Sequence, residues 1–190
     1  MPQVWAPLKP GDTVLIDQDD AQAGFTEYLL KRCKEEMPEE NWLPLEAHTN
    51  LYFVSHYPER LHERIYAISF APGFFLNLPL IDGFPEALAA MRDRGLKPKT
   101  CTSLIPGHQT CVQEKIEWTR RNVSHDFARV MHIGKDKTGV RGRILIDNRP
   151  HIIGDFVPEW EHVLYDQPHN RHVTDRRRLT WQNWKEVLVV

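Results

Sequence analysis

The chain of 190 residues contains only three cysteines, Cys33, Cys101 and Cys111, and none of them forms a CxxC motif. An odd number of cysteines without paired spacing is a poor basis for a disulfide framework, so we expect reduced thiols and a cytoplasmic location. No apolar stretch approaches the length of a membrane span. The N-terminal segment MPQVWAPLKPGD lacks the apolar run of a signal peptide, so none is expected.

An excess of charge of one sign is also missing. The chain has 24 Lys and Arg against 26 Asp and Glu, a formal net charge of −2. Without a broad cationic surface, neither a nucleic acid polymer nor an anionic membrane is an expected partner. A small phosphorylated ligand needs only a local basic group and stays open. The run Arg176-Arg177-Arg178 is too short to alter this and is predicted to be a solvated face.

The sequence does contain alternating strand and helix patterns. Strands are predicted at residues 13–16, 98–101, 128–131, 143–146 and 162–165, and helices at 23–37, 84–94, 109–121 and 181–189. This alternation predicts an α/β fold with a mostly parallel, Rossmann-like sheet and helices on both faces. Residues 38–80 are rich in aromatic residues and proline and lack this rhythm, so we expect an insert packed over the core.

Three of the predicted strands end in polar residues. These are Asp17 and Asp19, Thr102 and Ser103, and Asp147 and Asn148. Ligands bind beyond the carboxyl ends of the strands in open parallel sheets, so the three groups should meet at one place. Each group alone is more often a turn or a helix cap. Together with Lys115, on the helix after the second strand, they favour one functional site.

These residue types suit phosphoryl transfer. Asp17 can attack phosphorus as a carboxylate nucleophile and form an aspartyl-phosphate. Asp19 can protonate the leaving oxygen and then activate water. Thr102, Ser103 and Lys115 can bind the remaining phosphate oxygens and balance their charge. Clustered carboxylates repel each other and a phosphate, so a hard cation, Mg²⁺ before others, is the expected cofactor.

The same residues resemble the motifs of a known superfamily. Asp17-Gln18-Asp19 matches the first motif of the haloacid dehalogenase superfamily, and Thr102-Ser103, Lys115 and Asp147-Asn148 resemble its second, third and fourth motifs. A narrower resemblance, to the 5'(3')-deoxyribonucleotidases, runs through most of the chain and is weakest across residues 38–72. The segments that carry it are Cys101-Thr102-Ser103, Glu114-Lys115 followed by Trp118, Asp136-Lys137-Thr138, Ile146-Asp147-Asn148-Arg149-Pro150, Trp160-Glu161-His162-Val163-Leu164, His169-Asn170 and Arg176-Arg177-Arg178-Leu179.

This resemblance implies a fold and a function. Residues 1–22 and 81–190 would form a haloacid dehalogenase-like catalytic core, and residues 23–80 a small helical cap inserted after the first strand. The expected activity is a Mg²⁺-dependent phosphomonoesterase that dephosphorylates nucleoside monophosphates, deoxyribonucleotides in particular. Family members are often dimeric, which makes a homodimer plausible. In the cap, Phe25, Tyr52, Phe53 and Val54 would line the nucleoside site, although aromatic residues of a cap more often form its own core.

The resemblance also implies a metal site with a defect. Its residues are Asp17, Asp19, Asn148 and Asp147, where the family has a second aspartate in place of Asn148. An amide oxygen can bind Mg²⁺ but brings no charge, so binding should be weaker. The family usually has glycine at Asp20, a β-branched residue at Ala21 and an acidic residue at Gly24. Asp20 could therefore restore a negative charge near the metal.

Two other functions remain open at this point. The substrate could be a different small phosphomonoester, or Asn148 and Asp20 could have left a nucleotide-binding protein without turnover. Lys115 could equally be a solvated residue on its helix. The ten histidines are scattered and are expected to be exposed or hydrogen-bonded rather than metal ligands. His151, where the family often has an acid, could tune the site.

Overall fold

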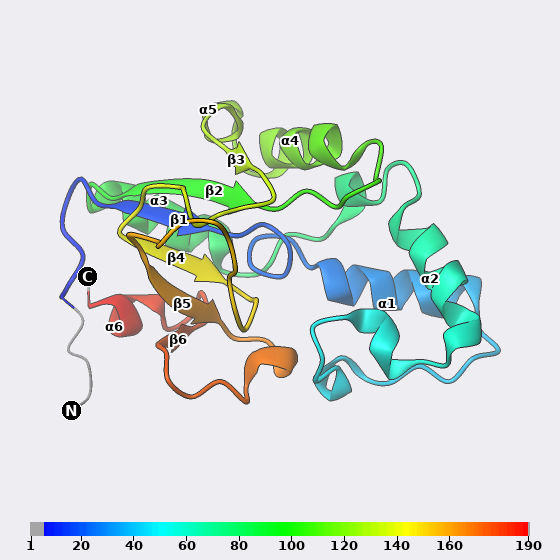
Figure 1. Cartoon of the computed structure of the whole chain (residues 1–190). Helices are drawn as coiled ribbons and strands as arrows, with labels where there is room; N and C mark the ends of the chain where they lie inside the picture. Colours follow the sequence, from blue (N-terminus) through cyan, green and yellow to red (C-terminus); the bar gives the residue numbers. More distant parts are fainter. Residues whose placement is uncertain (1–5, 190) are drawn as a thin grey trace.

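The computed structural model describes residues 6–189, which include a six-stranded sheet (Figure 1). The strands are β1 (Thr13–Ile16), β2 (Lys97–Thr102), β3 (His132–Ile133), β4 (Ile144–Asp147), β5 (Glu161–Tyr165) and β6 (Arg178–Leu179). Their order across the sheet is β3-β2-β1-β4-β5-β6, and every pairing is parallel. The predicted α/β fold is confirmed. β1 lies where the strand order reverses, which is where ligands bind in such sheets.

Helices lie between β1, β2 and β3 and after β6, whereas loops join β3 to β4 and β4 to β5. The described α-helices are α1 (Phe25–Glu36), α2 (His62–Ser69), α3 (Phe84–Asp93), α4 (Cys111–Asn122), α5 (His125–Arg129) and α6 (Trp184–Leu188), and the 3₁₀ helices are η1 (Leu45–Ala47), η2 (Phe53–His56), η3 (Glu59–Leu61), η4 (Phe75–Asn77) and η5 (Pro168–Asn170). None of the helices between residues 6 and 189 is long and apolar enough to span a membrane. The three cysteines are buried free thiols, as expected.

The two faces of the sheet are covered differently. On one face, Val14 and Ile144 belong to an apolar cluster that includes residues of α3, α5 and α6. On the other face, Leu15 and Leu145 pack against Trp160, Val140 and Ile152. These three residues belong to the loops after β3 and β4 (Figure 1). These loops are rich in glycine and proline, which disfavour helices. Loops therefore supply the cover over this part of the sheet.

Two local predictions were wrong. Residues 128–131 do not form a strand, because Ser124 caps α5 by accepting a hydrogen bond from the backbone N–H of Phe127 at 3.1 Å, and β3 begins only at His132. The arginine run is not a solvated face. The side chain of Arg177 is 14% exposed and forms an ion pair with Glu161 at 2.6 Å.

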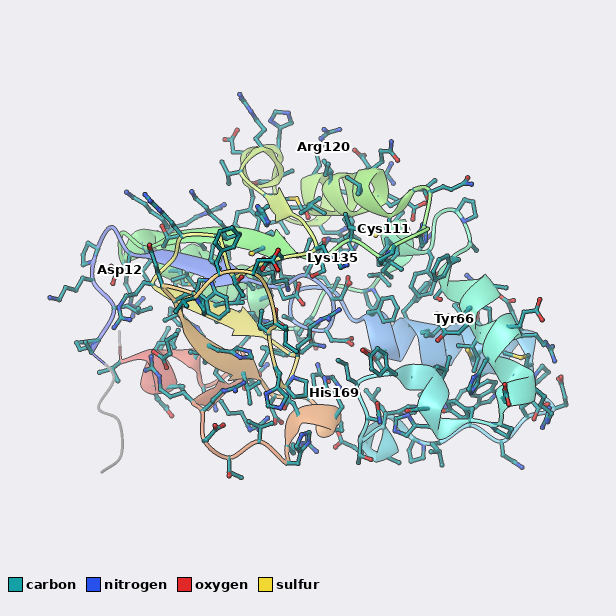
Figure 2. The ribbon with its side chains drawn as sticks, in the orientation of Figure 1. Asp12, Tyr66, Cys111, Arg120, Lys135 and His169 are labelled. Carbon is teal, nitrogen blue, oxygen red and sulfur yellow. The ribbon has the colours of Figure 1, made fainter. Side chains whose placement is uncertain are left out.

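The segment between β1 and α3 extends beyond the carboxyl ends of the strands (Figure 1). It leaves and returns at one place, where Ala23 and Leu80 form an antiparallel bridge. Its apolar cluster includes side chains of α1, α2 and the 3₁₀ helices and also Cys111 and Trp118 of α4 (Figure 2). The division into core and cap at 22/23 and 80/81 stays a prediction, and α4 is packed against this segment.

Candidate active site

Asp17 and Asp19 directly follow β1. The backbone N–H of Asp17 donates to the carbonyl of Ile146 at 2.8 Å, which extends the pairing of β1 with β4 by one residue. The amide of Gln18 donates to the carbonyl of Lys115 at 3.2 Å, so the loop is also tied to α4. Both carboxylates are thereby held at the carboxyl edge of the sheet.

Lys137 lies between two carboxylates below this edge. Its Nζ atom is 2.8 Å from Oδ1 of Asp17 and 2.6 Å from Oδ2 of Asp147. The second oxygen of Asp147 accepts the backbone N–H of Arg149 at 2.9 Å. All three charged side chains are almost fully buried. Each buried charge has a partner, as its desolvation requires.

Lys115 holds the other catalytic candidate. Its Nζ atom is 2.6 Å from Oδ2 of Asp19 and donates to Oγ1 of Thr102 and the carbonyl of Ser103, both at 3.0 Å. The side chain is fully buried, so the alternative of a solvated residue is wrong. Lys115 joins the ends of β1 and β2 at Asp19 and Thr102.

The pKa values of the two aspartates shift in opposite directions. Burial acts to raise the pKa of Asp17, but the charges of Lys137 and Lys115 outweigh it and the pKa is lowered. Burial raises the pKa of Asp19, and the charge of Lys115 offsets this only in part. Burial and the charge of Asp17 raise the pKa of Asp147 to about 6. One carboxylate is thus kept ionised beside another that favours its proton, which is the arrangement of an acid–base pair.

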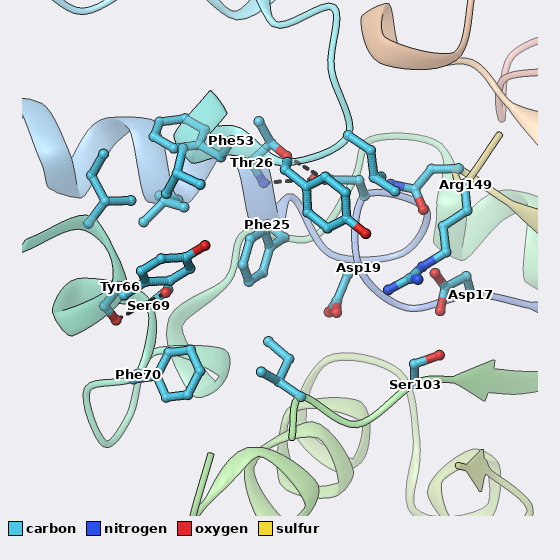
Figure 3. A pocket seen from close by; sticks show the side chains of 18 of the residues that line it. Asp17, Asp19, Phe25, Thr26, Phe53, Tyr66, Ser69, Phe70, Ser103 and Arg149 are labelled. Carbon is cyan, nitrogen blue, oxygen red and sulfur yellow. Dashed lines mark hydrogen bonds between the residues drawn. The ribbon is translucent and has the colours of Figure 1, made fainter. Parts of the chain in front are cut away.

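A cavity of about 310 Å³ opens onto these aspartates. Its core end is lined by Asp17, Asp19, Ser103, Asn148 and Arg149 (Figure 3). Among the other predicted site residues, Thr102, Lys115 and Asp147 do not line it, because they are buried beneath its floor. The volume is at the lower limit of typical small-molecule sites.

The other end of the cavity is formed by the cap. All four residues predicted for the nucleoside site line it, namely Phe25, Tyr52, Phe53 and Val54. Tyr66, Ser69 and Phe70 of the α2 region face them across the cavity (Figure 3). Phe53 is only 7% exposed and stacks on His48, with ring centroids 4.9 Å apart. It therefore serves the core of the cap and the cavity wall at the same time.

Two of the residues that depart from the family pattern, Asn148 and Asp20, occupy different environments. The backbone carbonyl of Asn148 accepts hydrogen bonds from His169 at 3.0 Å and Asn170 at 2.8 Å, and its amide side chain lines the cavity. The carboxylate of Asp20 accepts hydrogen bonds from the backbone N–H of Thr26 at 2.8 Å and from its hydroxyl at 2.5 Å. Burial raises the pKa of Asp20 to about 7. Asp20 thus faces α1 through both oxygens.

A divalent cation has oxygen donors at the core end of the cavity. Among the described residues, no group of three or more His, Cys, Asp or Glu side chains is arranged to hold a metal. However, Oδ2 of Asp17 and the side chain of Asn148 make no hydrogen bond within residues 6–189, and both residues line the cavity. Carboxylate, amide and backbone oxygens are the ligands of a hard cation, so these residues fit Mg²⁺.

Sequence reasoning gave no role to Lys137 or Arg149. Both are part of the segments that resemble the deoxyribonucleotidases. Lys137 follows β3 by four residues, and the strand predicted too early obscured its place at the sheet edge. Arg149 extends toward Asp17 and Asp19, and its charge helps to lower the pKa of Asp17 (Figure 3). The signal for Arg149 was a cation two residues after Asp147, the acid that ends β4. The signal for Lys137 was weaker, because β3 ends in Ile133 rather than in an acid.

Solved structures confirm the fold. A haloacid dehalogenase family hydrolase from Deinococcus radiodurans R1, crystallised with bound phosphate and sodium, aligns with a TM-score of 0.58 over 95% of this chain and 96% of that chain at 14% identity. At this identity the likeness concerns the fold alone.

Sequence comparisons identify the family. The model of the family described as "5' nucleotidase, deoxy (Pyrimidine), cytosolic type C protein" matches residues 12–190. The cytosolic-type 5'(3')-deoxyribonucleotidase of Homo sapiens is 36% identical over 189 residues, covering 92% of each chain. The mitochondrial 5'(3')-deoxyribonucleotidase of Homo sapiens is 32% identical over 185 residues, covering 92% of this chain and 81% of that protein. The chain therefore belongs to this nucleotidase family, and with it to the hydrolases of phosphoric monoesters, as its motifs predicted.

Proposed function

We propose that the protein is a Mg²⁺-dependent phosphomonoesterase that dephosphorylates nucleoside monophosphates, deoxyribonucleotides in particular, through an aspartyl-phosphate. The observation that carries the proposal is the pair Asp17 and Asp19 at one end of the cavity, with pKa values shifted in opposite directions. We include in the proposal a cytoplasmic location and a homodimer, which rest on the sequence and the family resemblance.

The two aspartates divide the chemistry between them. An ionised oxygen of Asp17 attacks phosphorus while the bond from phosphorus to the ester oxygen breaks. Asp19, whose raised pKa favours the protonated carboxyl, gives its proton to the leaving oxygen. The Asp19 carboxylate then takes a proton from water, whose oxygen attacks phosphorus and releases phosphate from Asp17. Lys115 holds Oδ2 of Asp19, whereas Oδ1 has no hydrogen-bond partner among the described residues.

Cations of the chain offset the charge of the phosphate. Lys137 keeps Asp17 ionised, and Arg149 lines the cavity beside it. Ser103, also in the lining, offers a hydroxyl and a backbone donor. Bound at Asp17, Asn148 and the backbone of Asp19, Mg²⁺ would supply electrostatic stabilisation of the phosphate oxygens.

The shape of the cavity supports a nucleoside monophosphate. Its charged end and its aromatic, apolar end match the phosphate and the base of such a molecule. Stacking of a base on an aromatic side chain stabilises binding by about 1–3 kcal/mol. The same shape disfavours small, fully polar sugar phosphates, which would leave the apolar end without contacts.

A phosphatase screen tests the proposal. Ribo- and deoxyribonucleoside monophosphates with 5' or 3' phosphates are compared with sugar phosphates, with and without Mg²⁺. We expect Mg²⁺-dependent release of phosphate from nucleotides, and Asp17→Asn should remove at least about three orders of magnitude of rate, since the site offers no second nucleophile. Preference for a sugar phosphate would change the substrate class, and nucleotide binding without turnover would leave a binding protein. A wild-type rate in the Asp17→Asn variant would exclude the aspartyl-phosphate.

A further inference from the structure

Asp20 lies between the catalytic loop and the cap. It follows Asp19 directly, and its backbone has a φ of 55°, a left-handed conformation that is rare for residues other than glycine. The residue is 6% exposed, and its carboxylate contacts the first turn of α1 through Thr26. Gln167, in the loop after β5, donates to its backbone carbonyl at 2.9 Å. The backbone of Asp20 is therefore bonded to the core through Gln167, and its side chain is bonded to α1 through Thr26.

The first turn of α1 lacks an ordinary side-chain cap. The N-cap position is Gly24, which has no side chain to accept the free N–H groups of the helix. Asp20 accepts the N–H of Thr26, the bond that an N-cap side chain would normally accept. The resemblance to the 5'(3')-deoxyribonucleotidases implies the reverse arrangement, with an acidic residue at position 24 and glycine at position 20. In this chain the acid and the glycine have exchanged places.

We propose that Asp20 is a positioning residue that caps α1 from the catalytic loop and so fixes the nucleoside wall of the cavity relative to Asp17 and Asp19. Phe25, which lines the cavity, is the residue before Thr26, so the capped turn carries an aromatic wall. A cap within the helix would stabilise α1 alone, whereas a cap from residue 20 also ties α1 to the catalytic loop. This inference rests on the proposed function for its kinetic consequence only.

The test compares four substitutions. Asp20→Gly removes the carboxylate and suits the positive φ. Asp20→Asn is the conservative variant, because its amide can accept from the N–H of Thr26 and donate to the hydroxyl. Asp20→Gly combined with Gly24→Asp restores the family arrangement, and Gly24→Asp alone is its control. A Cβ at Gly24 would lie 3.2 Å from Cγ of Pro79, so Asp20→Gly with Gly24→Ser provides a smaller cap should the aspartate be too crowded.

The kinetic readout is the KM for a nucleoside monophosphate beside that for glycerol 2-phosphate, which has no base. We expect Asp20→Gly to raise the nucleotide KM roughly three- to thirtyfold, the range that corresponds to loss of a helix cap. The values for glycerol 2-phosphate and the affinity for Mg²⁺ should stay unchanged. Asp20→Asn and the double variant should have a nucleotide KM close to that of wild type. Equal losses on both substrates, or failure of Asp20→Asn to rescue, would overturn the positioning role.

Hydrogen exchange separates this inference from the proposed function. In Asp20→Gly, backbone amides of the first turn of α1 should exchange faster than in wild type, while those of the first turn of α3, which begins after Gly83, should not. If the wild type hydrolyses no nucleotide, the proposed function fails. Asp20 would still be supported as the cap if exchange is faster in Asp20→Gly and returns to the wild-type rate when Gly24→Asp or Gly24→Ser is added. Unchanged exchange in Asp20→Gly would refute it.

Discussion

The two ends of the cavity are built in different ways. At the core end, buried charges are paired with each other, as in the contacts of Lys137 with Asp17 and Asp147. At the cap end, the lining is mainly aromatic and aliphatic, and some of it is open to solvent, such as Tyr52, which is 69% exposed. Removal of one partner from a buried ion pair leaves an unpaired charge, whereas apolar walls accept side chains of similar volume at small cost. The chemistry should therefore depend on the core end, and substrate choice on the cap end.

Asp19→Asn should lower the rate more than a substitution of Lys137, Phe53 or Asn148. Loss of general acid–base help costs about 10²–10⁴-fold in rate. The acid must be protonated, so the wild-type rate should fall as pH rises through the raised pKa of Asp19, and it should fall again in acid as Asp17, with its lowered pKa, becomes protonated. The variant should lose the alkaline limb and keep the acid limb. Rates near those of wild type across the pH range would exclude this role for Asp19.

Lys137→Met should affect stability and rate together. The substitution leaves Asp17 and Asp147 without their shared cation, and breaking a buried pair in this way costs about 3–5 kcal/mol of folding free energy. The pKa of Asp17 should rise without Lys137, so activity should decline at a higher pH than in wild type as the solution is acidified. Thermal unfolding and a pH–rate profile measure the two effects.

Lys135→Met, at an exposed lysine in the same loop, is the control and should change stability by less than about 0.5 kcal/mol (Figure 2). Equal behaviour of the two variants would contradict the importance of the buried pair.

The core end was largely predictable from the sequence. Apolar runs such as Thr13–Ile16 identify buried strands, and parallel pairing brings their carboxyl ends together whatever the sequence between them. Lys137 was missed because α5 and β3 follow each other within a few residues, too few for periodicity to separate them. The opposite pKa shifts of Asp17 and Asp19 depend on which lysine contacts which carboxylate, and only the folded structure gives that.

The cap end could be predicted only through the resemblance to a family. Residues 38–61 fold into η1, η2 and η3 joined by turns, and such short elements leave no repeating apolar pattern. The sequence also could not decide whether Phe53 faces the cavity or the interior, because the ring does both. The side chain of Asp20 was equally impossible to place, since it bonds to a residue of the following helix rather than to the catalytic loop.

Phe53→Leu should affect the cap end alone. Leucine keeps an apolar side chain against His48 but removes the aromatic face that a base could stack on. Stacking of about 1–3 kcal/mol corresponds to an increase of roughly 5- to 150-fold in the KM for nucleotides. The rate on glycerol 2-phosphate should stay the same. Phe84→Leu is the matched control, because this ring is buried in the other cluster beside Trp181 and should lower stability without a selective effect on nucleotides. A loss that is equal on both substrates would mean that Phe53 only supports the fold.

Asn148→Asp should have the smallest effect on the core end, because it adds a negative charge to the cavity without removing a contact. The backbone carbonyl of Asn148 is held by His169 and Asn170, so a new side chain should occupy the same place in the cavity. A second carboxylate beside Asp17 would attract Mg²⁺ more strongly than the neutral amide, and we expect roughly tenfold tighter binding. Titration calorimetry with Mg²⁺ measures this affinity without turnover.

Asp20 should not supply the charge that Asn148 lacks, because Thr26 donates hydrogen bonds to both oxygens of its carboxylate. Asp20→Gly should therefore leave the Mg²⁺ affinity unchanged, both in the wild-type chain and in Asn148→Asp. If Asp20→Gly alone weakened Mg²⁺ binding tenfold, Asp20 would carry the charge that Asn148 lacks, and the metal site would extend toward α1.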